Sequence, residues 1–228
     1  MDKALPACLA AAALAALAGC DAGSDRVANL NPFASFETRC SRLPAASITV
    51  HVPVVSFRED ESQSYEALSQ LSEITGTSHR TVGLTRARLS YASTLETRGL
   101  EDRRNGRVCA RPGIEVTLAV APMTVFIARE YAHDACRRAA TYAHEMKHVE
   151  VYRAFVQEGA ERLRRELPSV LGGHVHFAPD AARSQQALQA ALDTYLSAFL
   201  KESSETIRAR HADVDSPEEY ARIDGACA

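Results

Sequence analysis

The sequence of 228 residues lacks a surplus of basic residues: 26 Lys and Arg stand against 29 Asp and Glu, and the formal net charge is −3. Chains that bind nucleic acid usually carry clustered positive charge, so no nucleic-acid partner is predicted. The GxSxG, P-loop and GxGxxG patterns are also absent. Hydrophobic residues at 46% and charged residues at 24% exclude a disordered or fibrous chain and indicate a globular protein.

Long hydrophobic runs are missing except at the start of the chain, from Ala4 to Ala18. About 15 residues are too few to span a bilayer comfortably, but they suit the core of a signal peptide. The run ends in Leu17-Ala18-Gly19-Cys20, which resembles the lipobox of bacterial lipoproteins. We therefore predict a lipoprotein signal peptide at 1–19 and lipidation of Cys20. An ordinary signal peptide cut elsewhere and a buried Ala-rich helix are the alternatives.

The predicted anchor indicates where the protein acts. Asp21 follows Cys20 and resembles the inner-membrane retention signal of proteobacterial lipoproteins. Two or three acyl chains give stable membrane anchoring. We expect a tether over residues 20–44 and a single domain over 45–228 that faces the periplasm from the inner membrane. The membrane is then a partner through the acyl chains on Cys20.

The six cysteines change meaning once this signal is removed, because Cys8 is lost and Cys20 is committed to lipid. Four cysteines remain, namely Cys40, Cys109, Cys136 and Cys227. An even number outside the cytoplasm predicts two disulfides, with three possible pairings. Their wide spacing does not suit a cysteine-based zinc site, which uses closely spaced pairs.

The hydrophobic pattern predicts an α+β fold in which a mainly antiparallel sheet is followed by two long helices. Alternation predicts a strand at 47–52, stopped by Pro53, and helical spacing predicts a short helix within 60–74. Three further strands are expected at 82–91, 108–120 and 124–128, with a turn at Asn105-Gly106. Long helices are expected at 134–166 and 181–209.

One motif indicates a metal-dependent activity. It is the HExxH pattern within the first long helix, His144-Glu145-Met146-Lys147-His148. Histidines four residues apart lie one turn apart on one helix face, so both can bind one Zn²⁺ ion. The intervening Glu145 can act as general base on a water molecule. Two surface histidines beside an ordinary Glu–His contact are the alternative reading.

A catalytic zinc site usually has a third protein ligand, and the sequence leaves its identity open. His211, near the end of the second long helix, is the first choice, followed by Glu202 on that helix. The remaining candidates are His174, His176 and Asp215.

The order of these elements resembles bacterial secreted or lipid-anchored proteins of unknown function that are classed, by prediction, as zinc-dependent proteases. The shared elements span roughly residues 45–215. They are Gly83-Leu84-Thr85, Gly106-Arg107-Val108-Cys109, Pro122, the HExxH helix and a final helix with a His- and Asp-containing tail. That family often ends in Asp-x-x-Thr-x-His-Gly, whereas this chain continues from His211 to Tyr220. The resemblance implies a zincin-like fold and peptide-bond hydrolysis.

Three functions follow as hypotheses. The first is a membrane-anchored zinc metallopeptidase of the cell envelope. His144, His148 and His211 would bind the zinc, and Glu145 would be the general base. A strand between Val108 and Ala128 would form the edge that pairs with an extended peptide or protein substrate. The second is a zinc amidase acting on peptidoglycan peptides, since zinc-activated water can attack any amide. The third is a non-catalytic lipoprotein with a structural or vestigial metal site.

Overall fold

The computed structural model describes residues 34–72 and 80–227, in which Ser35 onward forms one compact unit. The predicted signal peptide and Cys20 lie outside the described residues. The fold is α+β and is organised around β4 (Val108–Ile127), a strand of 20 residues. At about 3.3 Å per residue this strand alone is roughly 60 Å long. The two ends of β4 therefore define two separate regions of the molecule.

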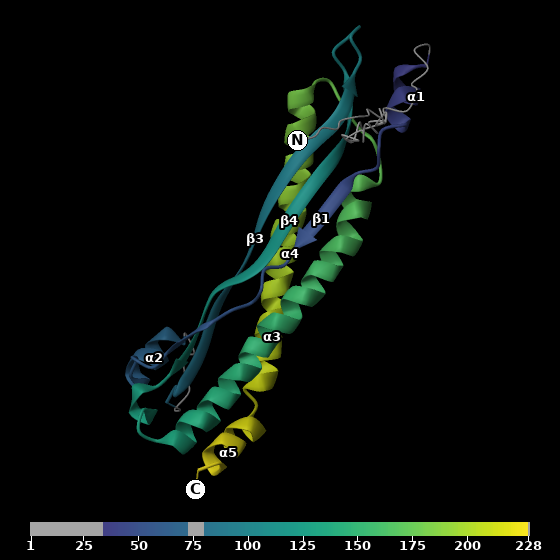
Figure 1. Cartoon of the computed structure of the whole chain (residues 1–228). Helices are drawn as coiled ribbons and strands as arrows, with labels where there is room; N and C mark the ends of the chain where they lie inside the picture. Colours follow the sequence, from purple (N-terminus) through teal and green to yellow (C-terminus); the bar gives the residue numbers. More distant parts are fainter. Residues whose placement is uncertain (1–33, 73–79, 228) are drawn as a thin grey trace, which may run out of the picture. The chain divides into compact units, whose positions relative to one another are not determined.

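The sheet is mixed, and β4 is its central strand (Figure 1). One edge of β4 pairs antiparallel with β3 (Gly83–Glu101) along almost its whole length. The other edge pairs in turn with β5 (His176–Ala178, antiparallel), β1 (Ser47–His51, parallel) and β2 (Arg58–Asp60, parallel). The predicted α+β class is confirmed. The prediction of a mainly antiparallel sheet is not confirmed, because β1 and β2 both pair parallel to β4.

Two long helices cover one face of the sheet, α3 (Ala135–Leu167) and α4 (Ala181–Val214) (Figure 1). Alternate side chains of β4 from Ile114 to Val120 point into this layer and are buried. At its centre a Cβ on Gly159 of α3 would lie 3.1 Å from Leu118 Cδ2 and 3.3 Å from Phe199 Cζ. The absence of a side chain at Gly159 therefore lets α3, α4 and β4 approach closely.

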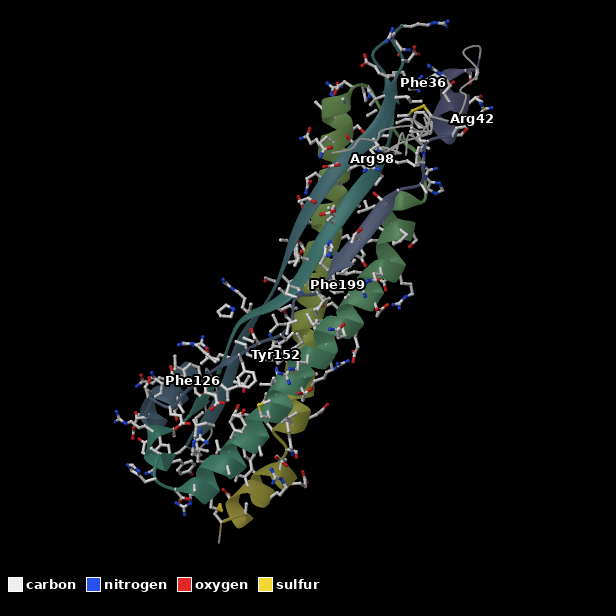
Figure 2. The ribbon with its side chains drawn as sticks, viewed as in Figure 1. Phe36, Arg42, Arg98, Phe126, Tyr152 and Phe199 are labelled. Atoms are coloured by element: carbon white, nitrogen blue, oxygen red, sulfur yellow. A yellow bond between two sulfur atoms is a disulfide. The ribbon has the colours of Figure 1, made fainter. Side chains whose placement is uncertain are left out.

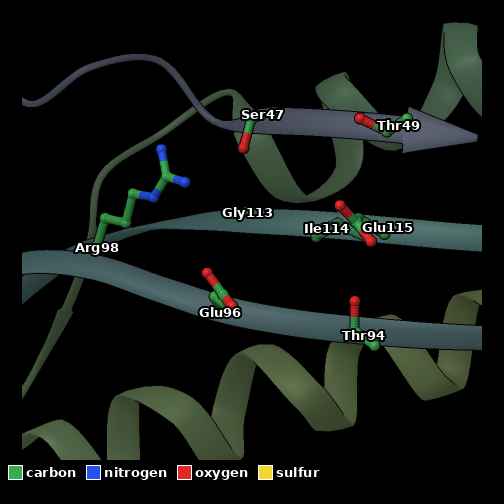
Figure 3. A pocket seen from close by; sticks show the side chains of 8 residues that line it. All are labelled: Ser47, Thr49, Thr94, Glu96, Arg98, Gly113, Ile114 and Glu115. Carbon is green, nitrogen blue, oxygen red and sulfur yellow. The ribbon is translucent and has the colours of Figure 1, made fainter. Parts of the chain in front are cut away.

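The opposite face of the sheet is polar and open along its middle. A shallow pocket of about 130 Å³ lies there, beside Gly113 and Glu115 of β4. Figure 3 shows the residues that line it. Glu96 and Arg98 of β3 and Thr49 of β1 also line it. The alternation of buried and exposed residues along β4 thus separates a covered apolar face from an open polar face.

Shorter helices close the two ends of the sheet. Near the start of β4, α1 (Phe36–Ser41) packs against Cys109, and Phe36 marks this end in Figure 2. Near its other end, α2 (Tyr65–Leu71) packs Leu68 against Phe126, also labelled in Figure 2. The remaining elements are η1 (Arg129–Tyr131), η2 (Pro168–Gly172) and α5 (Pro217–Gly225).

The strand at 47–52, the turn at Gly106 and both long helices were predicted correctly from sequence patterns. The two strands predicted on either side of Pro122 are in fact one strand. Pro122 lacks an N–H, but Ala121 and Pro122 together face a single residue of β3 at a β-bulge. On its other edge Pro122 lies between the pairings with β1 and β2, so no ladder hydrogen bond is lost.

The burial pattern predicts very different losses of stability for two residues of β4 that lie on opposite faces of the sheet. Leu118→Ala removes a fully buried side chain and should lower the free energy of unfolding by about 2–5 kcal/mol. Glu115→Ala, on the open face, should change it by less than about 0.5 kcal/mol. Urea unfolding followed by circular dichroism measures both. Equal losses would contradict the assignment of the covered face.

Candidate metal centre

Helix α3 places His144, Glu145 and His148 together in a buried group that could hold a metal ion. The helix continues for 33 residues, begins at an Asp134 cap and contains no proline. Residues four apart therefore lie on one face. The Nε2 atoms of His144 and His148 are 3.3 Å apart, and both imidazoles are buried.

Asp215 joins this pair from the junction between α4 and α5. Its Oδ1 atom lies 3.2 Å from Nε2 of His144 and 3.2 Å from Nε2 of His148. The three atoms form a nearly equilateral triangle. In a tetrahedral site with bonds of 2.0–2.1 Å, neighbouring ligand atoms are about 3.3 Å apart, so the triangle matches one face of such a site.

The other nitrogen of each imidazole is also engaged. Nδ1 of His144 lies 3.3 Å from Oε1 of Glu219, and Nδ1 of His148 lies 2.9 Å from Nδ1 of His211. Tyr152, labelled in Figure 2, packs on the His211 ring with a centroid distance of 4.7 Å. These contacts fix the ring planes so that both Nε2 atoms point toward Asp215.

His211, the first choice for the third ligand, therefore reaches the site on its outer side. Its contact is to Nδ1 of His148, the ring atom opposite the Nε2 that faces Asp215. Burial, followed by the charge of His148, lowers the pKa of His211 to about 4, which keeps His211 neutral, so its Nδ1 can accept a hydrogen bond from Nδ1–H of His148. The contacts favour Asp215 over His211 at the metal and give His211 a supporting position.

Glu145 is held from the opposite side by the first residues of β3. Thr85 Oγ1 donates a hydrogen bond of 2.8 Å to Glu145 Oε2. Gly83 passes so close that an added Cβ would collide with Oε1 of Glu145 and with Thr141. Burial raises the pKa of Glu145 above its ordinary value, against the opposing effects of His148 and Thr85. The carboxyl group is thus held in one position beside the histidines.

Charged and polar groups of α5 complete the site. Lys147 Nζ lies 2.7 Å from Glu219 Oε2, and Tyr220 donates a hydrogen bond of 3.1 Å to Asp215 Oδ1. Burial raises the pKa of Asp215, but the hydrogen bonds from His144 and His148 outweigh it and hold that pKa well below its ordinary value. A carboxylate at this position remains ionised, as a metal ligand must be.

The other candidate ligands lie elsewhere. Glu202 forms an ion pair of 2.8 Å with Arg162. His176 belongs to β5, which pairs with Val108–Ala110 at the far end of β4, and His174 just precedes it. Glu202, His174 and His176 are therefore wrong as third ligands. Helical spacing predicted α4 correctly but could not show that Glu202 lies away from His144.

Glu219, Tyr220 and the contact made by Thr85 were not identified from sequence. The segment Ser216-Pro217-Glu218-Glu219 does carry a helix-start signal, because Ser216 caps the helix and proline suits its first turn. Recognising α5 from that signal would have placed Glu219 and Tyr220 on a helix directly after Asp215.

Comparison with known proteins gave no match to a protein-family model, a curated protein or a solved structure. Within residues 34–72 and 80–227, none of the helices has the length and apolar character needed to cross a membrane.

The close approach of Gly83 to Glu145 can be tested directly. Gly83→Ala should lower the free energy of unfolding by about 1–3 kcal/mol, because the new methyl group displaces the Glu145 carboxylate or β3. Gly225→Ala, where a Cβ meets open space, is the matched control and should be nearly neutral. Thermal unfolding of both variants measures the difference, and an equally stable Gly83→Ala protein would contradict the described packing.

Proposed function

We propose that this protein is a zinc-dependent, zincin-like metallopeptidase that hydrolyses peptide bonds in the bacterial cell envelope. The observation that carries the proposal is the triangle formed by Nε2 of His144, Nε2 of His148 and Oδ1 of Asp215, with sides of 3.2–3.3 Å. Three buried or half-buried ligand atoms at this spacing suit a tetrahedral ion and leave a fourth position for water or substrate.

Zinc is the metal that best suits this donor set. Two imidazoles and one carboxylate, with no thiolate, form the ligand set of several catalytic zinc sites. The four cysteines of the described chain are engaged in disulfides and cannot contribute. The outer partners Glu219 and His211 resemble the hydrogen-bonding groups that usually orient metal-bound histidines.

The residues of the site then have distinct roles. A bound zinc ion supplies Lewis-acid polarisation of the amide carbonyl and of a water molecule. Glu145 takes the proton of the attacking water and passes it to the leaving amine. The raised pKa of Glu145 suits such a proton carrier. Thr85 and Gly83 hold the carboxylate in place, and Tyr220 supports Asp215.

The strand that accompanies an extended substrate is β3. The sequence-based choice, a strand between Val108 and Ala128, is less suitable, because those residues form β4, which pairs with β3 on one edge and with β5, β1 and β2 over most of the other. Among the described residues β3 pairs only with β4, so its second edge has no strand partner. Its start contacts Glu145 through Thr85. An extended polypeptide that adds to this edge would pass beside the base.

The metal ligands are tested by alanine substitution and chelator-competition measurements of zinc affinity. The wild-type protein should bind about one zinc per chain. Asp215→Ala should weaken binding far more than His211→Ala, for which the loss of an outer partner predicts a reduction on the order of 10–100-fold. His174→Ala, remote from the site, is the control and should bind as the wild type does. A larger loss in His211→Ala than in Asp215→Ala would restore His211 as the third ligand.

The catalytic role is tested with Glu145→Gln. This variant should keep its zinc but hydrolyse fluorescently labelled casein about 10²–10⁴-fold more slowly, because the base is lost. Glu150→Gln, on the exposed side of the same helix, should retain activity. Equal activity of zinc-loaded Glu145→Gln and wild type would refute the mechanism. Hydrolysis of peptidoglycan peptides without hydrolysis of casein would favour an amidase instead.

A further inference from the structure

The outer part of the metal centre is supplied by α5, a helix of nine residues. Glu219 contacts both His144 and Lys147, and Tyr220 donates to Asp215. Asp215 itself lies in the short link that joins α4 to α5, and Ser216 caps α5. The position of the proposed third ligand therefore depends on where α5 is held.

Hydrophobic packing contributes little to holding α5, because none of its residues is buried. An isolated helix of this length is also too short to be stable in water. Of its ion pairs with Lys and Arg, Glu219 with Arg222 lies within α5, whereas Lys147 with Glu219 joins α5 to α3 through a cation that is about half exposed. Partly exposed ion pairs of this kind are weak. The strongest link between α5 and the rest of the protein is therefore the Cys136–Cys227 disulfide.

This disulfide joins the end of α5 directly to the helix that carries the histidines. Cys136 is in the first turn of α3, two turns before His144, and Cys227 lies two residues beyond α5. Together with the contact between Asp215 and the histidines, the bond closes α5 against the start of α3. Breaking it leaves α5 attached to the protein only through the link after Val214 and through polar contacts.

The two disulfides differ in their access to solvent. Cys40 and Cys109 are completely buried beneath Phe36, at the other end of β4. Cys136 is exposed and Cys227 is partly exposed. Thiol–disulfide exchange requires the attacking thiolate to reach a sulfur atom, so a reductant can reach the second bond and not the first.

We propose that Cys136–Cys227 is a thiol-exchange site for a dithiol reductant and that its reduction weakens metal binding by releasing α5. This inference rests on the proposed zinc site. A thiolate of the reductant attacks one sulfur atom and forms a mixed disulfide, and the other cysteine leaves as a thiolate that takes up a proton. The second thiol of the reductant then displaces the remaining cysteine. The protein gains two electrons and two protons, and the reductant becomes a disulfide.

The experiment uses the full chain in mild detergent. Metal-free protein is treated with dithiothreitol, alkylated with iodoacetamide, desalted and then titrated with zinc in competition with a chelator. Mass spectrometry of the peptides should show alkylation of Cys136 and Cys227 while Cys40–Cys109 stays intact. Zinc affinity should fall about 10–100-fold, the range expected when outer partners of the ligands are lost.

A double variant, Cys136→Ser with Cys227→Ser, separates reduction from the effect of the alkyl groups and should show the same loss. Hydrogen exchange provides a second measurement, in which amides of α5 lose protection while those of β4 and α4 keep it. This comparison distinguishes local release from general unfolding.

Zinc affinity within twofold of the oxidised protein, or reduction of Cys40–Cys109 before Cys136–Cys227, would overturn the inference while leaving the zinc site intact. General loss of protection across β4 would also overturn it. If the oxidised wild-type protein binds no zinc, the proposed function fails, and this inference fails with it.

Discussion

The contact of Asp215 with both histidines is the interaction on which the candidate site depends, and it joins residues 67 and 71 positions apart. It forms because α4, a helix of 34 residues or about 50 Å, packs along α3 and brings the chain back to the histidines. Helix α3 leads the chain away from the site, β5 attaches the connection to the far end of β4, and α4 returns. A change of one turn in either helix would move Asp215 by about 5 Å and separate it from the histidines.

The sheet supports this arrangement by aligning elements along a single strand. Strands pair with both edges of β4, and the two long helices cover one of its faces. The direction of β4 therefore fixes the directions of the neighbouring strands and of α3 and α4. Helix α3 crosses the start of β3, and this crossing brings Thr85 to Glu145. The buried carboxyl group would be costly to desolvate without that hydrogen bond and the neighbouring imidazoles. The base is therefore held by β3, whereas the third ligand, Asp215, is positioned by the α4–α5 link.

The two disulfides stabilise opposite ends of this architecture. Cys40–Cys109 links α1 to the start of β4 inside a small apolar cluster, and Cys136–Cys227 links α5 to the start of α3. The first closes a loop of 69 residues and the second a loop of 91, so each restricts the unfolded chain substantially. Only the second lies next to groups that contact the candidate metal ligands. Its chemical state therefore bears on the site as well as on stability.

The amino-acid sequence by itself determined the features that depend on local spacing. The distance of four residues between His144 and His148 places them on one helix face, and the alternation at 47–52 predicts a strand with one face toward the core. The α+β class and both long helices follow from the same periodicities. The presence of four cysteines outside the predicted signal peptide allowed two disulfides but did not select the pairing, because spacing carries no information about which cysteines meet.

The tertiary structure decided everything that depends on long-range placement. Periodicity cannot give strand order or direction, so the mixed sheet and the central position of β4 could not be predicted. It also could not distinguish Asp215 from His211, since both lie within one turn of the end of α4 and only their orientation relative to α3 separates them. That orientation arises from the packing of two helices on one sheet and from the attachment of α5 at Cys136. These are contacts between residues that the sequence leaves far apart.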